Sequence, residues 1–373
     1  GLFRSVSSVV DLPEIFNDFF AHEIGSDVVS LKGQAVALEN GQMGVNIVIP
    51  NKSVSEANIM IASSHLSNIQ LYQPGVADPV QPDGRTIVNI NTNYFSLYKI
   101  VKPQLTGDWR MLYTSDQTRY NDANINVVFS YNLGTQVSIT PDAPHAKTDE
   151  ITVTAKFIAA DGKPATDENL YLKRPNAEGI VASISILSED GKVAYQTGIK
   201  MDKFSDRFEK KLALGTIADA LLHSGQYQLV VHFEGDGMKT DSASQPLTIE
   251  NQLPKLVANT DRFEDIVIHD PRSDDYANEA TGTVDIATLV TEPEGEALQY
   301  ALQPIEGEDV TEASLNGSVL ALTTKGQSGA QKVIVRAADP EGAYVDVPIQ
   351  VGVTSIRDQL ANTCKFSIKP VED

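Results

Sequence analysis

The chain has 373 residues, of which 41% are apolar, and this length favours two to four domains with separate cores. Its 50 acidic residues outnumber 29 basic ones, giving a net charge of −21. This balance excludes nucleic acid and anionic membrane surfaces as expected partners, because both require a basic surface. A membrane span needs ~18 consecutive apolar residues, and no stretch approaches that length.

A single cysteine, Cys364, rules out an internal disulfide framework. Both a cytosolic enzyme and a cysteine-poor bacterial surface protein fit that count, so composition leaves the compartment open.

The first element in chain order is a helix, predicted within "DLPEIFNDFFAHEIGSD" at 11–27. Asp11 and Glu14 have the spacing of a capping box, and Gly25 is a typical helix stop. The apolar residues recur at three- and four-residue spacing, so that one face is apolar. They are Leu12, Ile15, Phe16, Phe19, Phe20 and Ile24.

After Gly25 the apolar pattern changes to a period of two, which is typical of half-buried antiparallel strands. Clear examples are "NINVVFSYNL", "EITVTAKFIA", "QYQLVVHFEG" and "YVDVPIQVGV". Turn sequences such as "PDGR", "ADGK", "EDGK" and "DPEG" separate these runs. Strands do not alternate with long helices, so a parallel α/β enzyme fold is not expected.

Two proline-containing stretches, 138–150 and 248–259, separate strand-rich blocks of the length expected for β-sandwiches. The predicted fold class is all-β, with three tandem immunoglobulin-like or jelly-roll-type β-sandwiches preceded by one amphipathic α-helix. The predicted domains are a terminal helix at 1–26, sandwiches at 27–139, 140–251 and 252–355, and a tail or linker at 356–373.

The stretch "VKPQLTGDWRMLY" resembles a segment of the sandwich modules that follow von Willebrand factor A domains in surface proteins. The resemblance covers 31–139 and implies that Gly107 permits a turn while Trp109, the only tryptophan, anchors the core.

Two further stretches, "VDIATLVTEPEGEALQYAL" and "VIVRAADPEGAYVDVPIQVGV", resemble a bacterial cadherin-like repeat over 280–353. The match departs from the family at Glu292, where aspartate is usual. The middle block resembles a generic immunoglobulin-like or macroglobulin-like sandwich.

The segment "VSSVVDLPEIFNDFFAHEIGSDVV" resembles the closing helix of a von Willebrand factor A domain. The Asp-x-Ser-x-Ser metal motif of that domain is absent from the sequence. The resemblance therefore implies that the helix is the remnant of a preceding A domain; the alternative is that it packs on the first sandwich in its own right.

Candidate catalytic groups are few. The six histidines have no metal-ligand spacing, and Cys364 lies in a polar tail without a neighbouring histidine. We therefore expect no catalytic residue, no bound cofactor other than calcium, and no enzymatic activity. The histidines are His22, His65, His145, His223, His232 and His269.

The acidic turns "EPEGE" and "DPEG" supply the candidate metal ligands Glu292, Glu294, Asp339 and Glu341. Carboxylates gathered at one end of a sandwich can bind calcium through oxygen. The alternative is that each sequence makes only a tight turn, in which proline fixes φ and glycine accepts positive φ.

The sequence favours a non-catalytic stalk of an extracellular bacterial surface or secreted protein, which presents a binding head and meets an unidentified protein or glycan ligand. One alternative is a direct carbohydrate- or protein-binding module, for which Tyr94, Phe95 and Tyr98 supply aromatic rings unless they pack in the core. The other is a set of accessory domains of a secreted hydrolase whose catalytic domain lies outside this chain.

Overall fold

The computed structural model describes residues 12–62, 66–115, 123–142, 144–174, 177–217, 223–257, 262–268, 281–325 and 328–355. Within these residues the chain is almost entirely β, with one α-helix, which confirms the predicted fold class. The chain divides into two compact units. Unit 1 comprises 1–144, 149–221 and 226–248, and unit 2 comprises 145–148, 222–225 and 249–373. The predicted tail at 356–373, with Cys364, lies outside the described residues.

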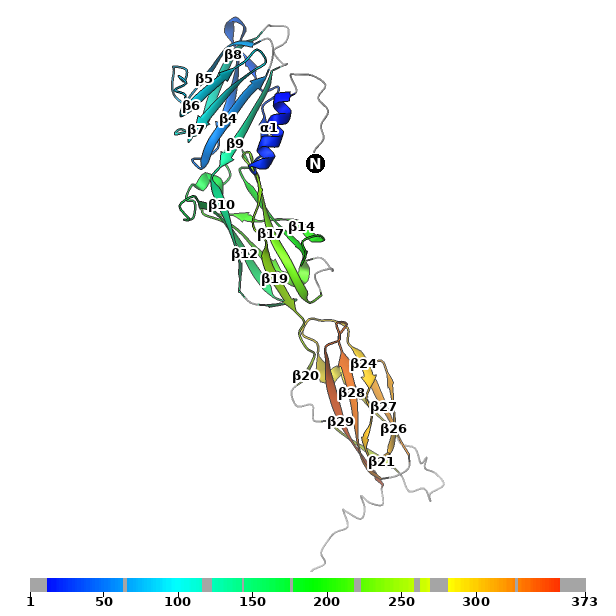
Figure 1. Ribbon diagram of the computed structural model, residues 1–373. Coiled ribbons are helices and arrows are strands. Elements are labelled where there is room, and N and C mark those ends of the chain that lie inside the picture. Colours follow the sequence, from blue (N-terminus) through cyan, green and yellow to red (C-terminus); the bar gives the residue numbers. More distant parts are fainter. Residues whose placement is uncertain are drawn as a thin grey trace, which may run out of the picture. The chain divides into compact units, whose positions relative to one another are not determined.

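Helix α1 (Leu12–Glu23) confirms the predicted helix and contacts strands β1 and β9 of unit 1 (Figure 1). Ala21 is buried, and Asn17 donates a hydrogen bond to the sulfur of Met60 at 3.7 Å. The predicted apolar face is only partly covered, because Phe19 and Phe20 remain 41% and 43% exposed. The helix thus packs on the first sandwich, as the alternative interpretation expected.

Sandwich 1 consists of two facing sheets in unit 1, with strand orders β1-β9-β4-β7-β6 and β2-β3-β8-β5. The strands of the first sheet are β1 (Val28–Ser30), β9 (Asn124–Tyr131), β4 (Val54–Ala62), β7 (Phe95–Val101) and β6 (Ile87–Asn91). Those of the second are β2 (Val36–Ala37), β3 (Gln42–Ile49), β8 (Gly107–Ser115) and β5 (Leu66–Tyr72).

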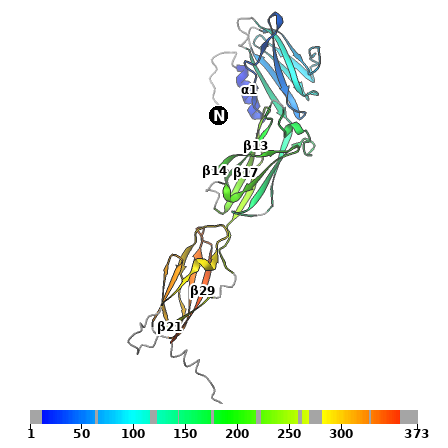
Figure 2. The ribbon, with the colours of Figure 1, turned by 180° about the vertical axis from the view of Figure 1, so that it is seen from behind.

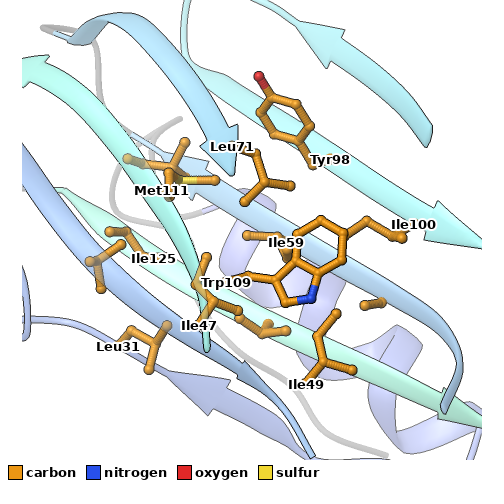
Figure 3. Close-up of a cluster of buried hydrophobic side chains, with 14 of the residues drawn as sticks. Leu31, Ile47, Ile49, Ile59, Leu71, Tyr98, Ile100, Trp109, Met111 and Ile125 are labelled. Atoms are coloured by element: carbon orange, nitrogen blue, oxygen red, sulfur yellow. The ribbon is translucent and has the colours of Figure 1, made fainter. Parts of the chain in front are cut away.

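The core of sandwich 1 surrounds Trp109, which is 1% exposed and lies among alternate residues of both sheets (Figure 3). Its indole N–H donates to the carbonyl of Leu105 at 3.0 Å, so the polar atom is satisfied inside the core. Gly107 has φ +97°, a conformation that favours glycine. Both residues have the roles that the sequence predicted.

Sandwich 2 also belongs mainly to unit 1, and its sheets are β10-β12-β16-β15 and β19-β17-β13-β14, with β18 paired to β17. The first sheet contains β10 (Leu133–Thr140), β12 (Glu150–Ala159), β16 (Phe208–Ala213) and β15 (Asp202–Lys203). The second contains β19 (Gln245–Glu250), β17 (Gly225–Gly235), β13 (Val181–Ser188), β14 (Ala194–Lys200) and β18 (Met238–Asp241). Four rings fill the core: Phe157, Tyr171, Phe208 and Phe233.

The position of strand β10 corrects the predicted boundary between sandwiches 1 and 2. The sequence assigned residues up to 139 to that sandwich, but β10 pairs with β12 over eight residues in sandwich 2. Sandwich 1 ends instead with β9, which pairs with β4. The alternating pattern of β10 fits either sheet, and the choice depends on a partner elsewhere in the chain.

Within unit 1 the β17–β18 turn lies against sandwich 1. Asp236 and Gly237 both have positive φ, as a two-residue Asp-Gly hairpin turn requires. The hydroxyl of Tyr131 donates to the Asp236 carbonyl at 2.7 Å, and a Cβ on Gly237 would lie 2.8 Å from the Phe129 ring. Only glycine fits this contact without displacing that ring.

Unit 2 contains sandwich 3, whose sheets are β21-β29-β28-β24, with β25 on β28, and β22-β27-β26. Its core is aliphatic, with Val333, Val335, Val347 and Ile349 fully buried on alternate positions. The first sheet contains β21 (Arg262–Ile268), β29 (Tyr344–Ser355), β28 (Gly329–Ala338), β24 (Gln299–Leu302) and β25 (Glu306–Gly307). The second contains β22 (Thr281–Asp285), β27 (Val319–Thr324) and β26 (Thr311–Asn316).

Short elements complete the described chain. Strand β20 (Lys255–Leu256) pairs with β23 (Val290–Thr291), and β11 (His145–Ala146) runs parallel to residues 249 and 250 of β19. Single-turn 3₁₀ helices are η2 (Glu39–Gly41), η3 (Glu168–Leu170), η4 (Leu214–Thr216) and η6 (Ile286–Leu289). In the part of the chain that the structure describes, no helix is long and apolar enough to cross a membrane.

Candidate functional site

The acidic turns that the sequence singled out both lie in unit 2 and are built alike. The Asp339 carboxylate accepts the backbone N–H groups of Glu341 and Ala343, each at 2.9 Å. Glu292 accepts the backbone N–H of Glu296 at 2.6 Å. Both carboxylates therefore accept hydrogen bonds from backbone N–H groups of their own turns, as expected if the two sequences form tight turns.

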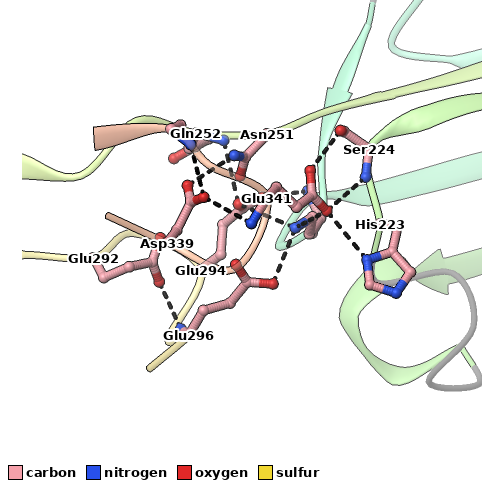
Figure 4. A network of polar contacts seen from close by, with 11 residues as sticks. His223, Ser224, Asn251, Gln252, Glu292, Glu294, Glu296, Asp339 and Glu341 are labelled. Atoms are coloured by element: carbon pink, nitrogen blue, oxygen red, sulfur yellow. Dashed lines mark hydrogen bonds and ion pairs between the residues drawn. The ribbon is translucent and has the colours of Figure 1, made fainter. Parts of the chain in front are cut away.

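The two turns meet at the ammonium group of Lys147, which comes from the short segment 145–148 of unit 2. Lys147 Nζ lies 2.7 Å from Glu341, 3.0 Å from Glu296 and 3.6 Å from Glu294. The side chains of Lys147 and Glu294 are only 3% and 1% exposed. In Figure 4 the side chains of Glu294, Glu296 and Glu341 point toward one another. We call Lys147, Glu294, Glu296 and Glu341 the lysine cluster.

Backbone groups complete the hydrogen bonding of the buried carboxylate of Glu294. It accepts the backbone N–H groups of Lys147 and Gln252, each at 3.2 Å. A buried charge is tolerated when it is both paired and hydrogen-bonded, and Glu294 meets both conditions.

The carboxylate of Glu341 also contacts residues 223 and 224. It accepts the backbone N–H of Ser224 at 2.9 Å and the Ser224 hydroxyl, and His223 Nδ1 lies 3.4 Å away (Figure 4). The lysine cluster therefore joins three stretches of unit 2 that are distant in sequence: 145–148, 222–225 and the turns of sandwich 3.

The pKa values of the cluster favour its charged form. Burial alone would raise the pKa of Glu341, but hydrogen bonds from Lys147 and Ser224 outweigh it and lower the pKa to about 2. Burial alone would lower the pKa of Lys147, but hydrogen bonds from Glu341 and Glu296 raise it. Lys147 is therefore a charged ammonium near neutral pH, and this charge state makes it a poor nucleophile.

Of the four carboxylates predicted as calcium ligands, the structure brings Glu294 and Glu341 together on Lys147, whereas Glu292 and Asp339 bind turn amides. Among the described residues, no three His, Cys, Asp or Glu side chains are arranged to hold a metal ion. Calcium binding stays a prediction.

Sequence reasoning missed Lys147, which lies in the proline-containing stretch between two predicted domains. Nothing in "DAPHAKTDE" marks this lysine, because its nearest acidic partner in sequence, Glu294, is 147 positions away.

The histidines in the described residues lie apart from one another. His145 is buried, whereas His22 is exposed on α1. His232 contacts Asp241 at 2.6 Å and Ser185 at 2.7 Å on sandwich 2. His65 and His269 lie outside the described residues.

We expect acid to destabilise unit 2 through Glu341. Its pKa in the folded state, about 2, lies below the ordinary value of 4.5. The stabilisation is therefore fully present above pH 4.5 and is lost as the pH falls towards 2. One pKa unit corresponds to about 1.4 kcal/mol, so the loss is on the order of 3 kcal/mol. Calorimetric unfolding between pH 7 and pH 2 measures it.

The matched control for this pH dependence is an exposed glutamate of sandwich 3. Glu341→Gln should reduce the acid-dependent decrease in the unfolding temperature of unit 2, whereas Glu312→Gln should keep it in full, and the remainder in Glu341→Gln comes from groups such as Asp346, whose pKa the hydrogen bond from Arg336 lowers. An equal decrease in both variants would show that other groups cause the acid sensitivity.

No protein-family model and no curated protein sequence matches this chain. Solved structures do match, among them the Yersinia pseudotuberculosis adhesin InvE, at 12% identity over 59% of this chain and 60% of that chain, with a TM-score of 0.26. The match thus spans less than two thirds of the InvE chain.

Two further similar structures are a titin tandem and a set of cadherin domains. The I9–I11 tandem of titin matches at 10% identity over 84% of this chain and all of that chain, with a TM-score of 0.24. Cadherin domains 1–5 of protocadherin gamma B2 match at 10% identity over 77% of this chain and 53% of that chain, with a TM-score of 0.22. Similarities at this level carry no information about function, and the fold described above rests on the strand pairing.

Proposed function

We propose that the chain is a non-catalytic, load-bearing stalk region of an extracellular bacterial surface or secreted protein. This is the role implied by the sequence resemblance to surface proteins with von Willebrand factor A domains. In this role the sandwiches hold a binding head at a distance and transmit tension between the two ends of the chain.

The observation that carries the proposal is the pairing of the first and last long strands of sandwich 3, which follow the two-residue strand β20. Strand β21 runs parallel to the last strand, β29, over seven residue pairs from Arg262–Ile349 to Ile268–Ser355 (Figure 2). Because the strands are parallel, tension applied at the start of β21 and the end of β29 pulls them in opposite directions along their length. All the hydrogen bonds of the ladder are then loaded together, in shear.

Sandwich 1 shows the opposite geometry. Its first strand, β1, pairs with its last strand, β9, in an antiparallel ladder of three residue pairs. The start of β1 and the end of β9 lie at the same end of that ladder, so tension opens the hydrogen bonds one after another. We therefore expect sandwich 3 to resist a higher force than the β1–β9 ladder.

Single-molecule stretching of the full chain from its two ends tests this proposal. Alternate residues of β21 direct their N–H groups to β29, so proline at one of two neighbouring positions removes a ladder hydrogen bond. The variants Asp265→Pro and Ile266→Pro form this matched pair. One of them should lower the unfolding force of sandwich 3, because it removes a bond of about 1 kcal/mol, and the other should change it much less.

Two results would argue against a load-bearing role. One is an unfolding force of sandwich 3 that is no higher than the force of the first unfolding step in the stretching trace. The other is an equal, small effect of both proline variants, since the β21–β29 ladder would then carry no load.

A further inference from the structure

Sandwich 1 has a pocket of about 500 Å³ at one end, between strand β5 and the turn that joins β6 to β7. The volume lies in the range of small-molecule sites. Six polar residues line it, and all are uncharged: Ser67, Asn68, Asn91, Thr92, Asn93 and Ser96.

The absence of charge from this lining is informative because the chain carries a net charge of −21. Among the described residues that line the pocket, none has an ionisable side chain. By contrast, the groove beside η3 in the same unit is lined by Lys52, Asp161, Lys163, Asp167 and Glu168. The described lining of this pocket thus offers no charge to attract a cation or an anion.

The lining combines amides with apolar side chains. Asparagine side chains both donate and accept hydrogen bonds, which matches a hydroxyl group that does the same. The lining also includes apolar residues: Ile61 is fully buried, whereas Leu66, Ile69 and Phe95 are partly exposed. A ligand with many hydroxyl groups and an apolar C–H face fits both parts, and a neutral sugar ring has this chemistry.

The walls of the pocket are held in place by hydrogen bonds. In the β6–β7 turn, the Thr92 hydroxyl accepts the N–H groups of Tyr94 and Phe95 at 3.1 and 3.0 Å. The Ser96 hydroxyl donates to the side chain of Asn91 at 2.5 Å. A pocket fixed before binding loses less conformational entropy when it takes up a ligand.

The opposite wall depends on an irregularity in β5. The pairing of β5 with β8 shifts register between Ser67 and Gln70, and Asn68 has φ +52° inside this bulge. Bulges of this kind redirect side chains, and asparagine tolerates the left-handed conformation better than most residues. Tyr98 secures the wall from the core, because its hydroxyl donates to the Ile69 carbonyl at 3.1 Å.

An aromatic ring lies next to the pocket in sequence. Tyr94, in the turn between Asn93 and Phe95, is 48% exposed, whereas Tyr98 is 5% exposed. Of the aromatic residues that the sequence proposed as carbohydrate contacts, Tyr98 therefore packs in the core and Tyr94 keeps an accessible ring. Such a ring supplies apolar area against the C–H face of a sugar.

We infer that this pocket of sandwich 1 is a binding site for a neutral saccharide. The amides of Asn68, Asn91 and Asn93 bind hydroxyl groups, and the partly exposed apolar residues Leu66, Ile69 and Phe95 contact the ring carbons. This site is independent of the load-bearing role proposed for sandwich 3, which uses other residues in the other unit.

Ligand-observed NMR and titration calorimetry on the full chain test the inference. The probes are cellohexaose, xylohexaose, mannohexaose, maltohexaose and chitohexaose, with sialyllactose and a heparin hexasaccharide as charged comparators. At least one neutral probe should bind, and the charged comparators should bind more weakly than that probe.

A double variant, Asn68→Gly with Asn93→Ala, removes two amides at exposed positions, and glycine keeps the left-handed conformation of residue 68. Loss of two hydrogen bonds should weaken binding by about tenfold or more. Asn316→Ala, at an exposed position of unit 2, is the matched control and should leave the affinity unchanged.

Three outcomes would overturn the inference. They are no binding of any neutral probe at millimolar concentration, binding that the double variant does not weaken, and equal or tighter binding of the charged comparators. An unchanged unfolding temperature of the double variant ensures that weaker binding reports on the pocket.

Discussion

Replacing Lys147 by methionine is expected to destabilise unit 2 by about 3 to 5 kcal/mol, the usual cost of removing one partner of a buried ion pair. The ammonium is 3% exposed and contacts Glu294, Glu296 and Glu341. Without it, Glu294 remains a buried carboxylate with no countercharge nearby. The free energy of unfolding of a typical domain is about 5 to 15 kcal/mol, so a loss of this size removes a large part of it.

Differential scanning calorimetry measures this effect as a lower unfolding temperature of unit 2. Lys163→Met is the matched control, because that lysine is 80% exposed beside Asp161, and it should change stability by less than about 0.5 kcal/mol. The double variant Lys147→Met with Glu341→Gln should lose less stability than the sum of the losses in the two single variants. The reason is that both substitutions remove the same ion pair. Equal effects of Lys147→Met and Lys163→Met would contradict the importance of the cluster.

Replacing Gly235 by alanine is expected to destabilise sandwich 2 strongly. Gly235 ends β17 with φ +128°, and a Cβ at this position would collide with the Gly179 carbonyl oxygen and lie 3.2 Å from Ile180 Cα. The backbone conformation alone costs on the order of 1 to 3 kcal/mol for a residue other than glycine. The collision adds to this cost, because both obstructing groups belong to the backbone of the adjacent segment and have little freedom to move.

Gly191→Ala separates the two contributions. Gly191 also has positive φ, +72°, but a Cβ there would meet no atom within 4 Å. It should therefore show the conformational cost without the collision. Urea unfolding of unit 1, followed by circular dichroism, compares the variants. Equal losses of stability would mean that β17 and the Gly179 segment separate easily.

The sequence determined the local structure of this chain. The period-two pattern predicted strands, because alternate residues of a half-buried strand face the core, and the structure buries them in that way in "EITVTAKFIA" at β12. The spacing and caps of residues 11–25 predicted helix α1. Trp109 was identified as a core residue from the resemblance of "VKPQLTGDWRMLY" to a known sandwich module, and it is 1% exposed.

The partners of these elements could not be predicted in the same way. An alternating strand fits any sheet with an apolar face, so β10 was placed in sandwich 1 although it pairs with β12 in sandwich 2. The helix face was predicted to be apolar, but only packing against β1 and β9 decides that Phe19 and Phe20 remain exposed.

The two candidate sites show the same division. The acidic turns were recognised from sequence, because Asp-Pro-Glu-Gly has a known turn geometry, and Tyr94 was noticed for its ring. The sequence alone could not identify Lys147 as the partner of Glu294 and Glu341, nor the neutral pocket beside Asn68 and Asn93. Periodicity and turn propensity act over a few residues, so the local sequence encodes them. Ion pairs and pockets form where segments distant in sequence come into contact, and only the tertiary structure determines which segments do so.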